Sequence, residues 1–342
     1  MLTDNLRITR THPLISPAVL EEELPLPDGA ARLVQGSRAA IKDILAGRDA
    51  RLLVVVGPCS VHDPAAALEY AERLARVAEQ VGERIFCVMR VYFEKPRTVM
   101  GWKGLINDPG LDGTYQINRG LRLARKLLLA VAEVGLPAGT EFLDTTFGQY
   151  YTDLVSWGAI GARTVESQIH RELASGLSMP VGIKNRTDGD VQVAVDAIRA
   201  ASHRHLFPSL TKEGAPAILE TSGNPDCHLV LRGGTRPNYD AASVEAALAL
   251  LRRAGLPEAV MVDCSHANSG KDPERQPDVA RTVCVERRAG NRALRALMIE
   301  SHLIGGRQDI GGTLRYGQSI TDACLGFDAT RDLLLTLAAA SE

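Results

Sequence analysis

Five basic residues stand at or soon after short apolar runs, where they could together hold an anionic substrate. They are Arg90, Lys95, Arg163, Lys184 and Arg232. Arginine and lysine side chains bind phosphate and carboxylate oxygens. Lysine supplies only seven of the 39 basic residues, so a lysine in such a set is less easily explained as an ordinary surface residue. If the fold brings the five cations together, their mutual repulsion favours a small, highly anionic ligand that carries phosphate and carboxylate groups.

Four other residues are of types that bind divalent metal ions. Cys59, His266, Glu300 and Asp322 offer a thiolate, an imidazole and two carboxylates, a mixture that suits a borderline transition metal. They lie far apart in the sequence, so their spacing gives no independent metal signal. A lone cysteine is more often a small buried apolar residue, and a lone histidine is often structural. The residues alone therefore only suggest a metal site.

The elements that must position these residues alternate between short apolar strands and amphipathic helices. Residues 52–56 (LLVVV) form a continuous apolar run, which is typical of a strand covered on both faces. Asp63 and Pro64 match the N-cap and the first position of a following helix. Apolar residues at helical spacing predict another helix over 117–131. Further strands are expected at 85–89, 139–143, 159–162, 180–183, 228–231, 259–262 and 297–299, and further helices at 149–157, 167–176, 190–201, 240–255, 277–288 and 328–339.

Eight strands with helical connections indicate an α/β fold, the (β/α)8 TIM barrel. The alternative is a doubly wound open sheet, which normally carries a glycine-rich phosphate turn after a strand. The sequence contains neither GxGxxG nor GxxxxGK[ST], so the barrel is preferred. In a barrel the carboxyl ends of all strands face one site. The residues expected there are Cys59, Arg90, Glu141, Arg163, Lys184, Arg232, His266 and Glu300.

The composition is that of an ordinary globular protein. The 342 residues are 45% hydrophobic and 23% charged, and the formal net charge is −2, which argues against a surface built to coat nucleic acid. Six cysteines form no CxxC pair, the N-terminus lacks the apolar core of a signal peptide, and no apolar stretch approaches membrane-spanning length. We expect a reduced, cytoplasmic protein with no membrane or nucleic-acid partner.

Two segments lie outside the barrel repeat. Residues 1–48 are expected to form an N-terminal arm and a helix that serve assembly or regulation, and the catalytic barrel is expected over 49–342. Within the barrel, residues 203–224 are expected to form an inserted β-hairpin, because two apolar runs flank the turn residues 212–214. From the pattern alone, plain structural elaboration explains these additions equally well.

Nine sequence blocks resemble type I 3-deoxy-D-arabino-heptulosonate-7-phosphate (DAHP) synthases, the class sensitive to phenylalanine, tyrosine or tryptophan. The blocks are residues 57–64 (GPCSVHDP), 90–98 (RVYFEKPRT), 101–109 (GWKGLINDP), 157–163 (WGAIGAR), 166–172 (ESQIHRE), 231–234 (LRGG), 263–269 (DCSHANS), 299–303 (IESHL) and 319–324 (SITDAC). The resemblance runs from the N-terminal arm to about residue 337.

The resemblance implies the first step of the shikimate pathway and thus of aromatic amino acid and chorismate biosynthesis. Phosphoenolpyruvate condenses with erythrose 4-phosphate and water, which yields DAHP and free phosphate. It also implies a TIM barrel and one divalent metal ion, which could be Mn, Fe, Co or Zn, with Mn as the first choice. Fold and anionic substrate agree with the expectations drawn from the residues.

The resemblance assigns the family's site roles to the matching residues of this sequence. The resemblance implies that the metal ligands are Cys59, His266, Glu300 and Asp322, and that Lys95, Pro96, Arg97 and Thr98 hold the erythrose phosphate. It implies that phosphoenolpyruvate lies on Arg90, Lys95, Glu141, Gly161, Ala162, Arg163, Lys184 and Arg232. Lys95, Cys59 and His266 form the expected catalytic group. Because its motif lies between the two substrates, Lys95 is hypothesised to donate a proton to the developing alkoxide; charge stabilisation alone is the alternative.

The resemblance also implies an allosteric site for an aromatic amino acid, built across subunits of a homodimer or homotetramer. The corresponding residues are Asp4, Asn5, Ile8, Gln149, Leu173, Ser178, Phe207, Ser209 and Leu219. Three features depart from the family pattern: Arg186 replaces a glycine, Gly148 replaces a proline, and the segment 305–316 is shortened. These departures leave open the identity of the effector and the shape of the phosphate pocket.

Two other functions stay open at this point. One is condensation of phosphoenolpyruvate with a different aldose phosphate, such as arabinose 5-phosphate. The cation added by Arg186 could alter the phosphate pocket and so keeps this alternative open. The other is a non-catalytic homologue that binds an amino acid and regulates a partner enzyme. Loss of a metal ligand or of a substrate-binding arginine would favour the second alternative, but all of them are present. The sequence does not distinguish primary from secondary metabolism.

Overall fold

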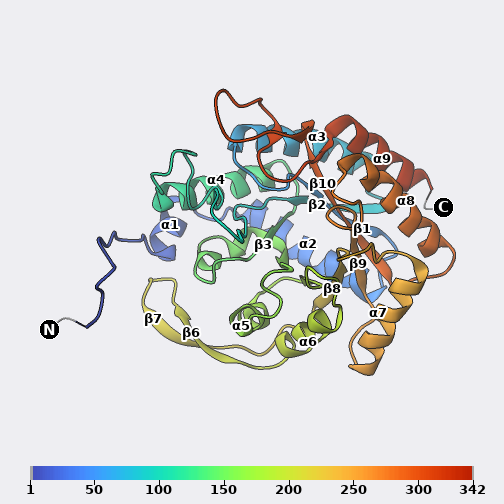
Figure 1. Ribbon diagram of the computed structural model, residues 1–342, viewed down its shortest axis with the longest axis horizontal. Coiled ribbons are helices and arrows are strands. Elements are labelled where there is room, and N and C mark those ends of the chain that lie inside the picture. Colours follow the sequence, from blue (N-terminus) through green and yellow to red (C-terminus); the bar gives the residue numbers. More distant parts are fainter. Residues whose placement is uncertain (1–2, 341–342) are drawn as a thin grey trace.

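The computed structural model describes residues 3–340, and eight parallel strands within it close into a barrel (Figure 1). Strand β1 pairs with β2 on one side and with β10 on the other, which closes the sheet. The barrel strands are β1 (Leu52–Gly57), β2 (Ile85–Arg90), β3 (Ala138–Glu141), β4 (Val155–Ile160), β5 (Val181–Lys184), β8 (Cys227–Leu231), β9 (Val260–Asp263) and β10 (Leu294–His302). The predicted (β/α)8 TIM barrel is confirmed.

Helices surround the barrel and connect most of its strands. They are α3 (Pro64–Val81), α4 (Ile117–Glu133), α5 (Gln168–Gly176), α6 (Gln192–Ala201), α7 (Ala241–Arg253), α8 (Gln276–Arg288) and α9 (Phe327–Ala339). Side-chain caps mark the start of two of these helices. The Asp63 carboxylate accepts hydrogen bonds from two backbone amides of α3, and the Asp240 carboxylate accepts one from the backbone amide of Ser243 in α7. The cap predicted at Asp63 is confirmed. Among residues 3–340, no helix combines the length and apolar character needed to cross a membrane.

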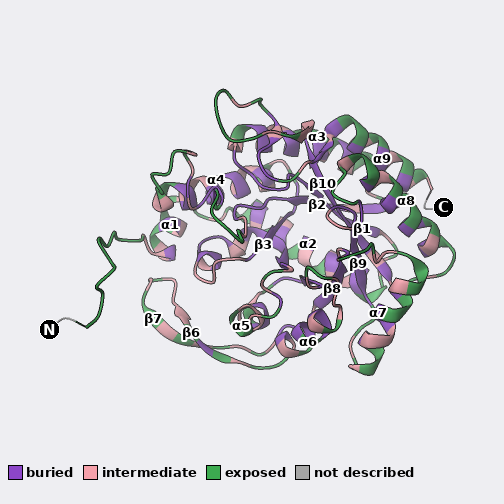
Figure 2. Ribbon diagram, in the orientation of Figure 1, coloured by how far each residue is buried: buried purple, intermediate pink, exposed green. Residues whose placement is uncertain are grey.

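Apolar residues of the strands alternate between two cores. In β1, Leu53 and Val55 point into the barrel, whereas Leu52, Val54 and Val56 pack in the layer between strands and helices. This alternation follows from the two-residue period of a strand. Buried residues accordingly fill the strands and the inner helix faces, while exposed residues follow the outside (Figure 2).

Helix α2 (Asp28–Ala46) closes the amino-terminal end of the barrel. Its residues Ile41, Ile44 and Leu45 belong to the interior cluster of the strands. The Arg38 guanidinium donates to the carbonyl of Val155, at the start of β4, at 2.8 and 3.0 Å. Among residues 3–340, this helix fills the amino-terminal end, so the barrel centre is open to a ligand at the carboxyl ends of the strands.

One connection was predicted wrongly. The expected helix at 149–157 and strand at 159–162 are replaced by two short 3-10 segments, Phe147–Tyr150 and Thr152–Leu154, followed directly by β4 at Val155–Ile160. The prediction failed because a short, fully buried apolar run does not distinguish a strand from a helix by its period.

The additional segments are a hairpin, an arm and a short C-terminal pairing. Strands β6 (Leu206–Leu210) and β7 (Pro216–Glu220) pair antiparallel within the expected segment 203–224. The N-terminal arm runs away from the barrel and leads into α1 (Pro17–Glu23) (Figure 1). After β10, strands β11 (Ile304–Arg307), β12 (Gln318–Ser319) and β13 (Leu325–Gly326) precede α9. Residues 1–2 and 341–342, at the ends of the two expected domains, lie outside the described residues.

Candidate active site

A cavity of about 630 Å³ opens at the carboxyl ends of the barrel strands. Arg90, Glu141 and Lys184 are the last residues of β2, β3 and β5, and the loops after β4 and β8 add Arg163 and Arg232. Ten of the predicted site residues line it: Arg90, Lys95, Pro96, Glu141, Ala162, Arg163, Lys184, Arg232, His266 and Asp322. The fold thus gathers all five cations that the sequence singled out.

Two of these cations have no carboxylate partner within residues 3–340. Arg163 donates from Nη1 to the carbonyl of Pro96 at 3.3 Å, and Arg232 donates from Nη1 to the carbonyl of Gly233 at 3.4 Å. Burial lowers the pKa of Arg232; Asp263 opposes that shift, and the charge of Arg163 adds to it. Two guanidinium groups that repel one another across a cavity, neither of them bound directly to a carboxylate, form a site for an anion.

Lys184 is held by a buried carboxylate. Its Nζ lies 2.8 Å from Oδ2 of Asp263, the last residue of β9. Burial acts to raise the pKa of Asp263, but the charges of Lys184 and His266 lower it well below its usual value. Asp263 stays ionised and fixes the ammonium of Lys184 in the wall of the cavity.

Arg90 is fixed on several sides. Its Nη2 lies 2.9 Å from Glu300 Oε1, its Nε donates to the carbonyl of Pro58 at 3.0 Å, and its guanidinium lies 3.5 Å from the ring centroid of Tyr92. Both Arg90 and Glu300 are buried. The charge of Arg90 is therefore committed to Glu300, unlike those of Arg163 and Arg232.

Three of the four predicted metal ligands meet at the floor of the cavity. Single ligand atoms of Cys59, Glu300 and Asp322 all lie within 4.8 Å of one another. The ammonium of Lys95 lies 2.8 Å from Cys59 Sγ and 2.8 Å from Asp322 Oδ2. Burial alone would lower the pKa of Lys95, but Cys59, Glu300 and Asp322 raise it. A cation therefore already lies among these donors, and the thiol and two carboxylates suit a borderline divalent metal.

The fourth predicted ligand, His266, lies beside this group rather than within it. Its Nε2 is 3.9 Å from Glu300 Oε1, and its Nδ1 is 3.0 Å from Asp263 Oδ2. The backbone of His266 has φ = 54°, in the left-handed region, a conformation that costs free energy in a residue other than glycine and often marks a functional site. A carboxylate on one ring nitrogen orients a histidine to offer the other nitrogen to a metal.

Burial also controls the protonation of the cysteine. It raises the pKa of Cys59 to about 11, and the nearby Glu300 contributes to this shift. This shift favours the thiol form of Cys59 at neutral pH. A bound divalent ion would favour the thiolate, because a coordinating thiol loses its proton.

Five predicted site residues do not line the cavity. Cys59 and Glu300 lie fully buried beneath it. Gly161 lies behind Glu141, and a side chain there would place its Cβ 2.1 Å from Glu141 Oε1, so it would displace the Glu141 carboxylate from this position. Arg97 and Thr98 are exposed near the cavity mouth, with Arg97 Nε donating to the carbonyl of Trp102 at 2.8 Å.

Several lining or supporting residues were not predicted. Asp263 stands at a strand end within the block 263–269, so a search for carboxylates at strand ends would have found it. Ser265 Oγ donates to Glu300 Oε2 at 3.0 Å and shows no sequence signal. Arg307 pairs with Asp309 and reaches the cavity from β11. The remaining unpredicted lining residues are Thr187, Gly234, Ala267, Ser269, Lys271, Pro273 and Ala323.

Arg186, the unusual cation beside Lys184, does not line the cavity. Its Nη2 lies 2.5 Å from Asp188 Oδ2 and its Nη1 lies 2.9 Å from Glu166 Oε1. Two carboxylates therefore neutralise its charge, and it adds no free cation to the site.

The predicted effector residues fall into two groups. Gln149, Leu173, Ser178, Phe207, Ser209 and Leu219 lie on the side where the β6–β7 hairpin adjoins α5 and the 3-10 segment 147–150. Lys212 of the hairpin joins these parts, since its Nζ lies 2.5 Å from Glu21 of α1 and donates to the Gln149 carbonyl at 2.5 Å. Asp4, Asn5 and Ile8 lie on the exposed arm. Gly148 has room for a side chain, because an added Cβ would find no atom closer than 3.5 Å.

Comparisons with known proteins agree over nearly the whole chain. A model of the DAHP synthetase I family matches residues 27–335. A Phe-sensitive phospho-2-dehydro-3-deoxyheptonate aldolase of Escherichia coli K12 is 56% identical over 98% of this chain and 96% of its own. A Trp-sensitive one from the same strain is 54% identical over 99% of this chain and 98% of its own. A solved structure of such an aldolase from Francisella tularensis SCHU S4 has a TM-score of 0.95 at 50% identity, covering 97% of this chain and 98% of that one.

Proposed function

We propose, on the premise that the chain belongs to the DAHP synthetase I family, that its barrel cavity condenses phosphoenolpyruvate with erythrose 4-phosphate and water. The products are DAHP and free phosphate. The observation that carries this proposal is the pair of unpartnered arginines, Arg163 and Arg232, in the same cavity as Lys184 and Lys95. This pattern suits a substrate with both a phosphate and a carboxylate.

Phosphoenolpyruvate is placed by the cations of the cavity wall. Arg163 and Arg232 offer guanidinium forks that form no ion pair within residues 3–340, and Lys184 adds an ammonium oriented by Asp263. Because Asp263 holds the ammonium of Lys184 before the substrate arrives, this group stabilises the substrate's charge with little reorganisation. Arg90 faces the same cavity, with its orientation fixed by Glu300 and Tyr92.

The reaction joins C3 of phosphoenolpyruvate to the aldehyde carbon of erythrose 4-phosphate. The aldehyde oxygen takes up a proton, water adds at C2, and the C–O bond to the phosphate breaks to release free phosphate. Lys95 is the donor of that proton, because its ammonium lies on the cavity wall and the carboxylates of Glu300 and Asp322 favour its protonated form.

One divalent metal ion fits the donors at the cavity floor. Cys59, Glu300 and Asp322 would hold it, and His266 would complete the set through Nε2. When bound, the ion supplies Lewis-acid polarisation of the aldehyde oxygen. Mn, Fe, Co and Zn all suit this mixture of ligands, with Mn as the first choice. Asp263 and Ser265 orient His266 and Glu300 from behind.

The second substrate lies at the mouth of the cavity. Lys95 and Pro96 line it, and Arg97 and Thr98 continue the same loop towards solvent. This placement leaves the Arg97 and Thr98 side chains accessible to the phosphate of erythrose 4-phosphate. The main argument for a different aldose phosphate was the extra cation of Arg186. That argument no longer holds, because two carboxylates neutralise the charge of Arg186 outside the cavity. A non-catalytic homologue finds no support either, because every group it would have lost is present.

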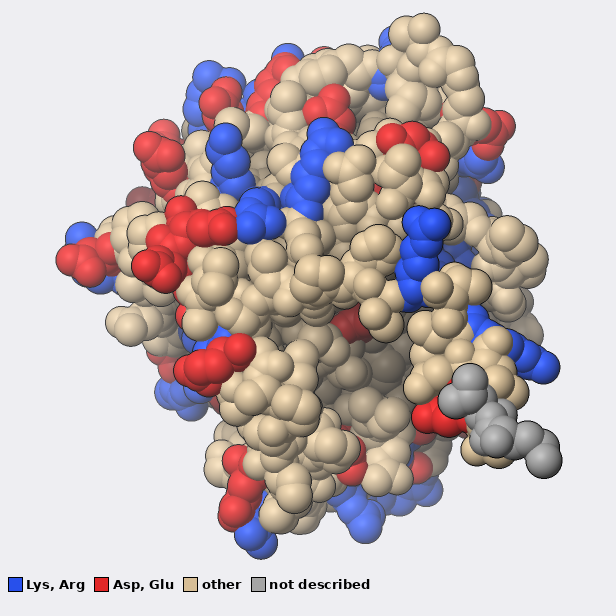
Figure 3. Space-filling model, turned by 90° about the vertical axis from the view of Figure 1, so that its left-hand side faces the viewer, with Lys and Arg blue, Asp and Glu red and all other residues tan. Residues whose placement is uncertain are grey.

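An aromatic amino acid inhibits the enzyme in this proposal, as the names of the Phe-sensitive and Trp-sensitive relatives suggest. The effector binds beside the β6–β7 hairpin. The arm residues Asp4, Asn5 and Ile8 of a second subunit complete its binding site. Leu6, Ile8, Leu206 and Ile218 are exposed apolar residues of the arm and hairpin. Figure 3 shows this side of the molecule, where the centre of the face carries few charges. A homodimer, or a homotetramer built from it, would cover these residues.

The chain is suited to the cytoplasm. All six cysteines are buried free thiols, which is typical of proteins in a reducing compartment.

Product analysis tests the proposal. Purified protein with Mn2+, phosphoenolpyruvate and erythrose 4-phosphate is expected to form one DAHP and one phosphate per phosphoenolpyruvate consumed, and EDTA is expected to stop both. Replacing erythrose 4-phosphate by arabinose 5-phosphate is expected to lower the rate by about 100-fold or more. Faster turnover with arabinose 5-phosphate would contradict the assigned substrate.

A further inference from the structure

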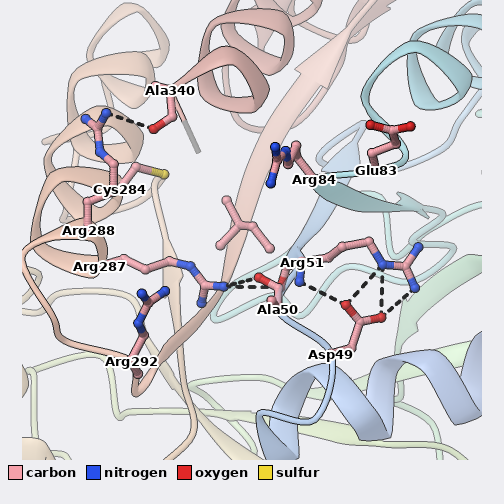
Figure 4. Close-up of a pocket in the computed structure, with 11 residues that line it drawn as sticks. Asp49, Ala50, Arg51, Glu83, Arg84, Cys284, Arg287, Arg288, Arg292 and Ala340 are labelled. Carbon is pink, nitrogen blue, oxygen red and sulfur yellow. Dashed lines mark hydrogen bonds and ion pairs between the residues drawn. The ribbon is translucent and has the colours of Figure 1, made fainter. Parts of the chain in front are cut away.

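A second cavity, of about 310 Å³, lies at the opposite end of the barrel from the active site (Figure 4). Its walls come from the segment that enters β1, the residues just before β2, and the end of α8 with the loop that follows it. Its charged lining residues are the arginines 51, 84, 287, 288 and 292 and the carboxylates of Asp49 and Glu83. The condensation uses none of them, since the α2 plug separates the two ends.

Only one of these arginines is neutralised by a carboxylate. Arg51 binds Asp49 through Nη2 at 2.6 Å and through Nε at 2.9 Å. Within residues 3–340, the structure gives no ion pair to Arg84, Arg287 or Arg292. Arg288 likewise has only a carbonyl partner, that of Ala340 at 2.8 Å. The cavity therefore gathers more positive charge than the protein neutralises.

Arg287 shows the imbalance most clearly, because it is only 9% exposed. Its guanidinium donates to the carbonyls of Leu294 and Ala50, both at 2.6 Å. Burial lowers the pKa of Arg287, and the charges of Arg295 and Arg292 lower it further. A buried guanidinium among other cations is costly unless an anion joins it.

The helix dipole explains part of this cluster. Arg287 and Arg288 stand in the last turn of α8, where cations are favourable. Arg84 and Arg292 belong to other segments, so that explanation does not cover them. In Figure 4, Arg287 and Arg292 enter from one side and Arg84 from another, while the Asp49 carboxylate is turned to Arg51.

We propose that this cavity binds a phosphoryl group. Guanidinium forks match phosphate oxygens in pairs, and the volume admits inorganic phosphate or the phosphate end of a small organic ester. The shared chemistry is a compact anion with a double negative charge. This anion could be inorganic phosphate or the phosphate group of an organic ester. Separate titrations with inorganic phosphate and with glycerol 3-phosphate distinguish the two, because glycerol 3-phosphate is a monoester that lacks the aldehyde and the enol of the substrates.

Calorimetric titration of the full chain tests this proposal. The double variant Arg84→Ala/Arg292→Ala removes two exposed cations, and Arg281→Ala, which lies on α8 and pairs with Asp278 outside the cavity, is the matched control. The native protein is expected to show one phosphate site beyond the active site. The double variant is expected to bind there at least about tenfold more weakly, with kcat and the KM for phosphoenolpyruvate unchanged.

Each outcome supports or overturns the proposed site. If the double variant alone binds inorganic phosphate, the monoester or both more weakly, the site is supported and its ligand is identified. Identical isotherms in the native protein and the double variant would overturn the proposal, and so would an equal loss in Arg281→Ala, since that would reveal only a general effect of net charge. The unchanged kcat shows that the double variant is folded.

Discussion

Lys184 Nζ lies 2.8 Å from Asp263 Oδ2, and the two side chains are 5% and 0% exposed. The pair joins the ends of two barrel strands, β5 and β9, at the wall of the barrel cavity. A buried pair of this kind is costly to break on one side only, because the remaining charge has no solvent and no partner.

Asp263→Asn is therefore expected to lower the free energy of unfolding by about 3 kcal/mol and to raise the KM for phosphoenolpyruvate, because Lys184 loses its orientation. Urea unfolding and steady-state kinetics measure the two effects. Asp278→Asn, which breaks an exposed pair with Arg281, is the control and should change stability by less than about 1 kcal/mol.

The double variant Asp263→Asn/Lys184→Met separates structure from binding. It removes both charges, so it should regain much of the lost stability while phosphoenolpyruvate binding stays impaired. Recovery of a normal KM in the double variant would show that Lys184 does not hold the substrate.

Lys95→Met tests proton transfer. We expect kcat to fall by about two orders of magnitude or more, because the variant keeps the length of the side chain but has no proton to give. Metal content, measured on the same sample, should not fall, since the Lys95 ammonium lies among the donor atoms and repels a cation there. Lys103→Met, at an exposed position nearby, is the control. A near-normal kcat in Lys95→Met would end the proposed role.

Arg186→Gly tests whether the unusual arginine shapes the pocket. Its guanidinium is bound to Asp188 and Glu166 outside the cavity. We therefore expect the ratio of kcat/KM for erythrose 4-phosphate to that for arabinose 5-phosphate to stay within about threefold of the native value. A shift of that ratio by more than about tenfold would place Arg186 in substrate selection.

Glu94, next to Lys95, predicts a pH dependence of stability. Burial raises its pKa to about 8, and the charge of Asp144 contributes. Between the unfolded value of about 4.5 and the folded value of about 8, the folded protein holds a proton that the unfolded chain has lost. Glu94 thus makes stability fall as pH rises through that window. Glu94→Gln should flatten the fall in Tm between pH 5 and pH 8, unlike the exposed control Glu79→Gln. An unchanged slope in Glu94→Gln would contradict this assignment.

Regulation is checked in the same activity assay. Phenylalanine, tyrosine and tryptophan are added separately at millimolar concentration, and at least one is expected to inhibit. Asp4→Ala, on the exposed arm far from the cavity, should keep the basal kcat and lose sensitivity to that amino acid. Activity that resists all three would remove the regulatory part of the proposal.

The sequence predicted the barrel because its strands are short apolar runs and its helices carry clear caps, as at Asp63 and Asp240. It predicted the cations and the three candidate metal ligands that meet because each stands at or beside a strand end or in a specific motif. It missed the start of β4, since a buried apolar run has no diagnostic period.

Partnerships between residues distant in the sequence could not be predicted. Asp263 and Lys184 are 79 residues apart, and only the closed barrel brings them together. For the same reason, the sequence did not show that Arg186 is neutralised away from the cavity while Arg163 and Arg232 are left unpartnered.

The central claim is that these two unpartnered arginines hold phosphoenolpyruvate, and its binding tests that claim most directly. Calorimetry with the native protein, Arg232→Ala and the exposed control Arg236→Ala measures the affinity without the second substrate. We predict that Arg232→Ala weakens phosphoenolpyruvate binding by about 100-fold and that Arg236→Ala leaves it unchanged. Equal affinity in all three proteins would contradict the assignment of this cavity as the phosphoenolpyruvate site.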